Sequence, residues 1–335
     1  MHSFRVRWHL ALILALLAFT VANSAQTKSL RLVSTAWTPF TNVEGQPRFA
    51  LELVEAGLGR ISLAATTTVV AAAQFTPALL TGPYDGSAAV WRDAERERAL
   101  LFSQPYLENR LILVARSGST ASAANLAALK GQRIAIVEGY AYGAEVDNAG
   151  PTYLRSRSED DSLRMLLDNR VDYALMDDLV VQYLVSAYPE EARTRLQIGA
   201  APLVTRPLHL AIRRSLPDAA SIIDRFNAQL RAMISDHTYH RLLHVQWIRA
   251  DIDGDGIPEY VAESDKVGKT QPQNAYNLFS KEALTAQVNK EQERYFFGGA
   301  VYNGWSSVPD RYKVDHLNRP DSVHPTARLF TFTWK

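Results

Sequence analysis

The stretch YDGSAAVWRDAERERALLFSQPY (Tyr84–Tyr106) reads as a strand, a charged turn and the opening of a second strand. Arg96 lies in the turn, six positions before the Phe-Ser pair that opens the new strand. A second stretch, NRVDYALMDD (Asn169–Asp178), places Asp177 just past an apolar strand, at the end where open α/β sheets bind ligands. A guanidinium can hold a carboxylate through two parallel hydrogen bonds, and a carboxylate can accept an ammonium group. The two side chains together predict a clamp for an α-amino acid.

Strand and helix patterns alternate from Leu30 to about Trp247, which indicates an α/β fold with mainly parallel sheets covered by helices. A loop rich in Ser, Gly and Ala at 116–124 separates two such runs. The expected strands are 29–37, 65–70, 86–90, 111–115, 133–138, 172–176 and 207–212, and the expected helices are 49–58, 75–80, 141–147, 162–169, 179–188, 219–235 and 237–247.

Both quoted stretches resemble the bacterial periplasmic solute-binding proteins of family 3, the amino-acid-binding type that serves ABC transporters. The resemblance runs from about Leu30 to Trp247 and implies a two-lobed, type II fold. Lobe 1 is then 26–112 with 207–249, and lobe 2 is 113–206. Two strands cross between the lobes near 110–116 and 204–209. The resemblance also implies that Arg96 binds the α-carboxylate, that Asp177 binds the α-ammonium, and that Trp37 presents its ring to the ligand.

For two of these assignments, a neighbouring residue is an alternative candidate. Arg98 lies two residues after Arg96 and points away if the turn is helical, although both arginines could belong to a charged surface turn. Asp178 competes with Asp177, and Asp177 could instead cap the next helix.

Three aromatic residues complete the predicted binding set. Phe40, beside Trp37, either meets the ligand or packs in the core. Tyr140 follows Gly139 at a helix start, where the resembled family often has Thr or Ser. Trp91 stands where amino-acid binders commonly have a hydroxyl residue, which indicates a pocket that is smaller, more aromatic, or suited to a ligand other than a standard amino acid.

The N-terminus predicts export. His2, Arg5 and Arg7 precede an apolar run and then the small residues Ala22–Ala25, so residues 1–25 read as a cleaved signal peptide, with an uncleaved anchor as the alternative. The 335-residue chain has no cysteine and a net charge of +1, so we expect neither disulfides nor a nucleic-acid partner. The expected location is the periplasm.

An acidic loop, DIDGDGIPE, follows the resembled region. It is similar to the DxDGDG calcium loops of dockerin and integrin-type repeats, and it predicts Ca²⁺ ligands at Asp251, Asp253, Asp255, Ile257 (through its carbonyl) and Glu259. The twelfth position is Ala262 rather than Glu, and a metal-free acidic turn is the alternative. Residues 250–335 form an extension to which the sequence assigns no role.

No nucleophile or zinc-protease motif is present, so we expect no cofactor for chemistry and no enzyme. The leading hypothesis is a monomeric receptor that captures a small polar ligand, such as an amino acid, between closing lobes for an inner-membrane ABC permease. A ligand sensor for a membrane signalling partner is the second hypothesis. A periplasmic dehydratase-like enzyme, with Glu138 as general acid, is the third.

Overall fold

The computed structural model describes residues 29–315, except 244–245, 273–274 and 279–292. The predicted signal peptide lies outside the described residues. Within them, no helix combines the length and the apolar character that crossing a membrane requires.

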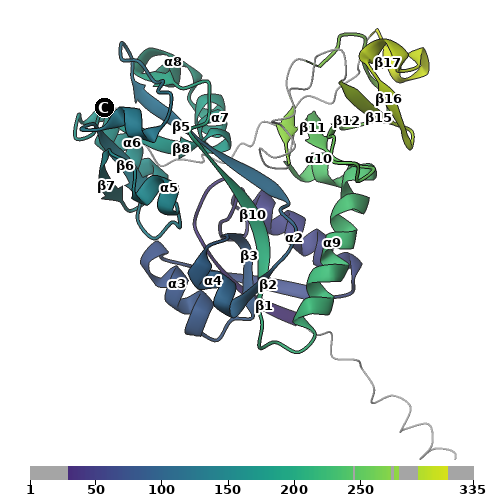
Figure 1. Ribbon diagram of the computed structural model, residues 1–335, viewed down its shortest axis with the longest axis horizontal. Helices are drawn as coiled ribbons and strands as arrows, with labels where there is room; N and C mark the ends of the chain where they lie inside the picture. The colour runs from purple at the N-terminus through teal and green to yellow at the C-terminus, as the bar shows by residue number, and fades with distance from the viewer. Residues whose placement is uncertain (1–28, 244–245, 273–274, 279–292, 316–335) are drawn as a thin grey trace, which may run out of the picture.

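The chain forms two α/β lobes on one continuous sheet, with strand order β2-β1-β3-β10-β5-β8-β6-β7 (Figure 1). Each lobe has a parallel core of strands, β2-β1-β3 in lobe 1 and β8-β6-β7 in lobe 2. Lobe 1 contains β1 (Ser29–Thr35), α2 (Phe49–Arg60), β2 (Ala64–Val70), α3 (Ala72–Thr81), β3 (Gly86–Trp91), α4 (Ala94–Ala99), β4 (Leu100–Phe102), α9 (Ala219–Ser235) and α10 (Thr238–Leu243). Lobe 2 contains η1 (Leu126–Leu129), β6 (Arg133–Val137), α5 (Ala144–Asp147), β7 (Thr152–Ser156), α6 (Glu159–Leu167), β8 (Tyr173–Asp177), α7 (Asp178–Ala187), α8 (Pro189–Arg195) and β9 (Leu196–Ile198).

Two long antiparallel strands join the lobes, close to the segments at which the family resemblance implied a crossing. They are β5 (Leu107–Arg116) and β10 (Val204–Arg213), and they pair from Leu107 with Leu208 to Leu111 with Val204. In Figure 1 these strands run between the two lobes. Strand β5 is buried along most of its length, and β10 is half-buried at 205–207 and buried at 208–212, so the connection is a packed hinge rather than a loose linker.

The central strand β3 shows why the stretch Tyr84–Tyr106 decides the fold. All six of its residues are buried, which is typical of a strand covered on both faces. It pairs with β1 on one side and with the crossing strand β10 on the other. The turn that carries Arg96 therefore starts where lobe 1 meets the hinge.

The extension has a sheet of its own, in the order β14-β11-β12-β15-β16. Its strands are β11 (Trp247–Ala250), β12 (Glu259–Ala262), β14 (Tyr276–Asn277), β15 (Arg294–Phe297) and β16 (Ala300–Asn303). A two-stranded sheet, β13 (Val267–Gly268) with β17 (Lys313–Val314), and the turns η3 (Trp305–Ser307) and η4 (Asp310–Tyr312) complete it. Aromatic rings fill its core, with Tyr260 stacked on Tyr295 at 5.2 Å between centroids.

The expected helix over 237–247 is wrong at its C-terminal end. The observed helix α10 ends at Leu243, and Trp247 begins strand β11, where it pairs with Ala262. The segment alternates between half-buried and buried residues, and its pairing with β12 outweighs the local helical pattern.

The extension packs against the hinge. The Tyr276 hydroxyl donates a hydrogen bond of 2.6 Å to the carbonyl oxygen of Glu108 on β5. The Arg110 guanidinium lies 5.1 Å from the centroid of the Tyr276 ring. On the side of α10, His240 Nε2 lies 2.9 Å from the Val261 carbonyl, and burial lowers the pKa of His240 to about 4. A neutral His240 therefore donates to β12 and ties the extension to lobe 1.

Replacing Tyr276 with Phe tests this attachment. We expect Tyr276→Phe to lower the free energy of unfolding by about 1 kcal/mol, because the buried Glu108 carbonyl loses a donor. Urea unfolding measures the change. Tyr153→Phe is the matched control, since the Tyr153 hydroxyl is buried with no hydrogen-bond partner among the described residues. Equal effects of the two substitutions would show that the Tyr276 hydroxyl does not hold the extension.

Candidate ligand-binding site

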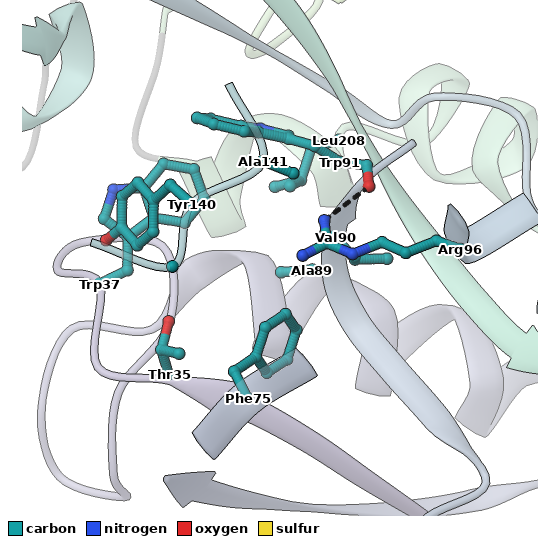
Figure 2. Close-up of a pocket in the computed structure, with 11 residues that line it drawn as sticks. Thr35, Trp37, Phe75, Ala89, Val90, Trp91, Arg96, Tyr140, Ala141 and Leu208 are labelled. Atoms are coloured by element: carbon teal, nitrogen blue, oxygen red, sulfur yellow. Dashed lines mark hydrogen bonds between the residues drawn. The ribbon is translucent and has the colours of Figure 1, made fainter. Parts of the chain in front are cut away.

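A narrow pocket lies between the lobes at the hinge (Figure 2). Lobe 1 supplies Thr35, Trp37, Phe75, Ala89, Val90, Trp91 and Arg96, strand β10 supplies Leu208, and lobe 2 supplies Gly139, Tyr140 and Ala141. The cavity has a volume of about 30 Å³. That is room for about two water molecules, so an amino acid enters only if the lobes or the lining side chains move.

The lobes meet closely at Gly139. This residue has a positive φ of 80°, and a Cβ there would lie 2.9 Å from the Ala72 carbonyl oxygen of α3 in the opposite lobe. Glycine is thus required both by the backbone conformation and by the close approach. The structure therefore shows the cleft in a closed arrangement.

Arg96 is the charged residue of the pocket lining. Its helix α4 begins at a cap in which the Asp93 side chain accepts from the Arg96 backbone N–H at 2.8 Å. The Arg96 side chain is buried at 4% exposure, whereas Arg98 is exposed, as the sequence argument expected.

The two terminal nitrogens of the Arg96 guanidinium contact neutral oxygens. One terminal nitrogen donates to the Trp91 carbonyl at 3.0 Å, and the other reaches Thr76 Oγ1 at 3.4 Å. Nε lies 3.3 Å from Asp93 Oδ2 but makes no hydrogen bond, and burial lowers the pKa of Arg96. A ligand carboxylate can replace these weak neutral acceptors with two charge-assisted bonds.

Aromatic rings form the rest of the wall. Trp37 lies 5.3 Å from Tyr140 and 5.5 Å from Trp91 between ring centroids, and Tyr142 lies 5.6 Å from Trp91. Figure 2 shows the Tyr140 ring of lobe 2 against Trp37 of lobe 1. Phe40 packs 4.4 Å from Trp37, is fully buried, and does not line the pocket. Of the predicted aromatic residues, three thus meet at the cleft and Phe40 supports them from the core.

Asp177 lies behind this wall rather than in the pocket lining. Its Oδ1 accepts from the Leu179 backbone N–H at 2.9 Å, so it caps α7, the alternative that the sequence had left open. Its Oδ2 accepts from Asn109 Nδ2 at 3.0 Å, and Asn109 Oδ1 in turn accepts from Trp91 Nε1 at 2.8 Å. A hydrogen-bond relay therefore joins the pocket wall to Asp177. Its rival Asp178 pairs with Arg110 at 2.7 Å.

Sequence reasoning missed a second buried carboxyl, Glu159. It is the first residue of α6, with 9% of its surface exposed, and its Oε2 has no hydrogen-bond partner in the described part of the chain. Burial, with smaller contributions from Asp177 and Asp160, raises the pKa of Glu159 to about 8. Burial and the neighbouring Asp178 raise the pKa of Asp177 to about 8 as well. The capping signal Ser158 could have placed Glu159 at a helix start, but nothing in the sequence showed its burial.

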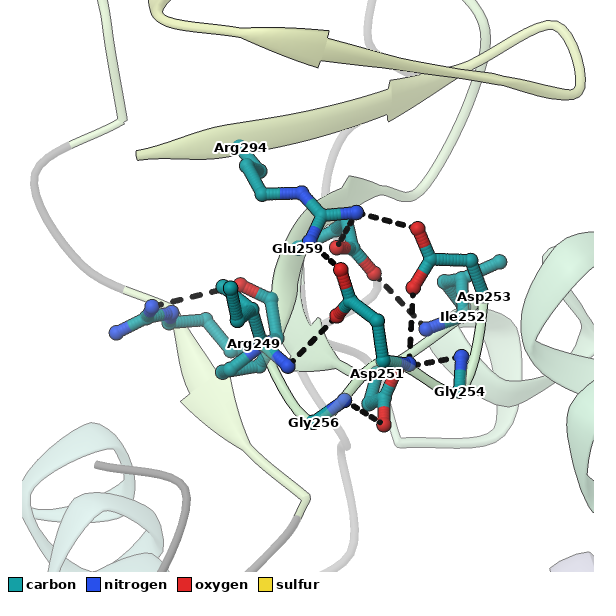
Figure 3. A network of polar contacts seen from close by, with 11 residues as sticks. Arg249, Asp251, Ile252, Asp253, Gly254, Gly256, Glu259 and Arg294 are labelled. Carbon is teal, nitrogen blue, oxygen red and sulfur yellow. Dashed lines mark hydrogen bonds and ion pairs between the residues drawn. The ribbon is translucent and has the colours of Figure 1, made fainter. Parts of the chain in front are cut away.

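The acidic loop of the extension lies close to a guanidinium (Figure 3). Arg294 of β15 forms ion pairs with Asp253, with Asp255, and with Glu259 at 2.9 Å. Oxygens of Asp251, Asp253 and Glu259 lie within 4.8 Å of one another, so these three could share one cation. Asp255 lies outside that group, and the Ile257 side chain is exposed. Arg294 thus already supplies positive charge to three of the five predicted ligands.

The fold, the hinge and the closed cleft are those of a two-lobed solute receptor. A family model described as bacterial extracellular solute-binding proteins, family 3, matches residues 32–250. The chain belongs to this family, which places it outside the cytoplasm as a solute-binding protein of the kind that captures ligands for ABC transporters.

Among curated proteins, the chain is similar to the ABC transporter arginine-binding protein 1 of Escherichia coli (strain K12). The two are 27% identical over 252 residues, covering 71% of this chain and 98% of the relative. These homologues are binding proteins rather than enzymes.

Solved structures show the same fold. ArgBP from T. maritima (P235GK mutant) superposes with a TM-score of 0.53 at 22% identity, covering 64% of this chain and 93% of that one. The GluR0 ligand-binding core of Nostoc punctiforme, in complex with L-glutamate, gives a TM-score of 0.54 at 18% identity, covering 64% and 96%. The aligned share matches the two lobes in extent.

The raised pKa of Glu159 predicts a pH-dependent stability in the absence of ligand. Folding favours the protonated carboxyl, so this stabilisation is complete below about pH 4.5 and is lost as pH rises through about 8. Between pH 5 and 8, the free energy of unfolding should fall in the wild type relative to Glu159→Gln by about 1 kcal/mol per pH unit. Urea unfolding at several pH values measures this. Glu138→Gln, at an exposed position, is the control and should follow the wild type; parallel profiles for wild type and Glu159→Gln would contradict the assignment.

Proposed function

We propose that this protein captures an α-amino acid in the periplasm and delivers it to an inner-membrane ABC permease. The observation that carries the proposal is the guanidinium of Arg96, buried in the lining of a pocket between two closed lobes. A buried guanidinium whose terminal nitrogens meet only neutral oxygens favours an anionic group on the ligand.

The placement of charge supports a zwitterion as ligand. Arg96 belongs to lobe 1, and Asp177 lies at the end of β8 in lobe 2. The ligand's α-carboxylate binds Arg96 and its α-ammonium binds Asp177, so one molecule contacts both lobes. Because these contacts exist together only when the lobes are near, the ligand stabilises the closed state over the open one.

The remaining features of the proposal follow from the relatives and from the N-terminal sequence. The printed name of the E. coli relative makes L-arginine the first ligand to test. Residues 1–25 are removed as a signal peptide on export to the periplasm. The mature chain works as a monomer and carries out no chemistry on its ligand.

Calorimetry on Arg96→Ala tests the proposal. Removing the guanidinium strands the ligand carboxylate in the closed cleft, so we expect the binding free energy of the preferred amino acid to weaken by about 2–5 kcal/mol. Arg98→Ala is the matched control, because it removes the same charge from an exposed position two residues away and should leave affinity unchanged. Unchanged affinity in Arg96→Ala, or equal losses in both variants, would reject the carboxylate assignment.

Ligand sensing is the second candidate function, and one contact favours it. Tyr276 of the extension touches the hinge strand at Glu108 and Arg110, so lobe movement can reach the extension surface. Uptake assays in cells that lack the protein separate the two functions. Lost uptake supports delivery, whereas normal uptake with a lost response to the ligand supports sensing. The dehydratase hypothesis loses support because Glu138 is exposed outside the pocket lining, and product formation from prephenate-like acids would revive it.

We further propose that Ca²⁺ can bind the acidic loop in competition with Arg294. The support is the cluster of Asp251, Asp253 and Glu259 oxygens, which suits a hard cation. Calcium should raise the thermal midpoint of Arg294→Gln by several degrees and that of the wild type by less, because the guanidinium already neutralises the loop. Scanning calorimetry with calcium and with a chelator measures both shifts. No shift in either protein would show that the loop does not bind calcium, even when Arg294 is removed.

A further inference from the structure

The extension reaches the binding residues from behind the cleft, through Tyr276 of strand β14. This side chain is buried at 6% exposure, and the pairing of β14 with β11, Tyr276 opposite Ile248, fixes its backbone. Its hydroxyl donates to the Glu108 carbonyl of β5, and its ring faces the Arg110 guanidinium at 5.1 Å. Leu278, two residues later, is buried in the main core. The ring of Tyr276 therefore has a fixed position against the hinge strand.

Arg110 lies between this ring and the two carboxyls at the end of β8. A terminal nitrogen of its guanidinium is 2.7 Å from Asp178 Oδ2, while its Nε is buried with no hydrogen-bond partner among the described residues. The face of an aromatic ring attracts a guanidinium, more strongly where water is excluded. The ring of Tyr276 thus helps to keep the Arg110 guanidinium on Asp178, where a single ion pair would leave it freer to move.

The charges of this ion pair act on the neighbouring Asp177, the last residue of β8. Asp177 pairs with Leu111 of β5, so Arg110 and Asp178 follow directly on the two strands. Burial and then the negative charge of Asp178 raise the pKa of Asp177, whereas the hydrogen bond from Asn109 and the positive charge of Arg110 lower it. Arg110 therefore favours the ionised form of Asp177 both directly and by neutralising Asp178.

No other cation takes part among the groups that surround Asp177 in the described part of the chain. The charged and titratable groups that act on it, or on which it acts, come from five segments. They are Asp178 of α7, Arg110 of β5, Glu159 of α6, Tyr140 after β6 and Tyr276 of β14. Of these five groups, Arg110 alone carries a positive charge. The ionisation of Asp177 thus depends on where Arg110 is held.

We propose that Tyr276 and Arg110 are positioning residues of the ligand site. The ring of Tyr276 holds the Arg110 guanidinium beside Asp178, and this guanidinium favours the charged form of Asp177 that binds the α-ammonium of the ligand. The inference rests on the proposed function, in which Asp177 has that role. The extension is then part of the binding machinery, because a shift of β14 away from the hinge weakens ligand capture without any change in the cleft lining.

NMR of the aspartate carboxyl carbons, in the protein without ligand, tests the electrostatic step. The Asp177 signal, identified by its loss in Asp177→Asn, reports the pH at which this carboxyl ionises, about 8 in the wild type. Arg110→Gln should move this midpoint upward by about one pH unit, because the carboxyl loses its cation. Arg110→Lys keeps the charge and should restore most of the difference. Arg133→Gln is the matched control, since it breaks a 2.8 Å ion pair with Asp172 elsewhere in lobe 2 and should leave the midpoint unchanged.

Variants of Tyr276 test the part played by the extension. Tyr276→Leu removes the aromatic face but keeps an apolar side chain, so the midpoint should move in the same direction as in Arg110→Gln, by a smaller amount. Tyr276→Phe keeps the ring and should leave the midpoint close to that of the wild type. When Arg110→Gln is already present, adding Tyr276→Leu should cause no further shift, because the ring acts through the guanidinium. An unchanged midpoint in Tyr276→Leu, or a full second shift in the double variant, would overturn the proposal.

Calorimetry with L-arginine tests the consequence for binding. The α-ammonium binds the charged carboxyl, so affinity should rise with pH as Asp177 ionises. Arg110→Gln should bind L-arginine about tenfold more weakly than the wild type at pH 7, and the difference should shrink at higher pH. Tyr276→Leu should show a smaller loss with the same dependence on pH. A loss that is equal at every pH would indicate damage to the structure of the cleft and would contradict the positioning role.

The outcomes separate this inference from the function on which it rests. If L-arginine binds the wild type and Arg96→Ala weakens it, but Arg110→Gln and Tyr276→Leu leave the ionisation of Asp177 unchanged, the positioning role is wrong and the proposed function stands. If the midpoint of Asp177 shifts as expected but no amino acid binds the wild type, the proposed function fails, and the role of Tyr276 and Arg110 in binding fails with it.

Discussion

The buried guanidinium of Arg96 is the charge on which the arrangement of the cleft depends. It lies under aromatic rings in the wall between two lobes, with Asp93 along its inner edge and a smaller contribution from Glu95 as partial counter-charges. A charge removed from water needs a partner of opposite sign. In lobe 2, the buried acids Asp177 and Glu159 lie behind the opposite wall. A molecule with both signs of charge satisfies the two walls at once, which links binding to closure.

The hinge strands couple ligand binding to the movement of the lobes. Strands β5 and β10 carry residues that face the pocket and the acids, namely Leu208 in the lining and Asn109 in the relay from Trp91 to Asp177. The extension contacts strand β5 through the hydrogen bond from the Tyr276 hydroxyl to the Glu108 carbonyl. Movement between the lobes therefore changes the surroundings of the binding residues and of the extension together. The extension is thus placed where it can stabilise one hinge geometry, or present that geometry to a partner.

The sequence predicted the parts that depend on local pattern. The alternation of apolar strands and helices indicated the α/β fold, whereas the two lobes and the two crossing strands were implied by the resemblance to family 3. The turn at Arg96 identified the buried arginine over the exposed Arg98 because helical direction separates residues two apart. The family to which the chain belongs was also recognisable from these stretches.

The predictions that were wrong or missed depend on contacts between residues far apart in the sequence. The helix expected to reach Trp247 gives way to β11, whose partner strand follows only after the acidic loop. The short strands β14 and β15 pair in parallel with distant segments, which no local pattern reveals. Glu159 stands in the acidic run SEDDS, which is typical of an exposed helix start, and only the packing of lobe 2 buries it. Arg294 is likewise far in sequence from the loop that it neutralises.

The most direct test of the account removes the carboxylate from the ligand instead of the arginine from the protein. Agmatine is arginine without its α-carboxylate. If Arg96 binds that carboxylate, Arg96→Ala should weaken L-arginine about thirtyfold or more and leave the weak affinity for agmatine nearly unchanged. Equal weakening of both ligands by Arg96→Ala would show that the buried guanidinium supports the fold of the cleft and does not hold the ligand.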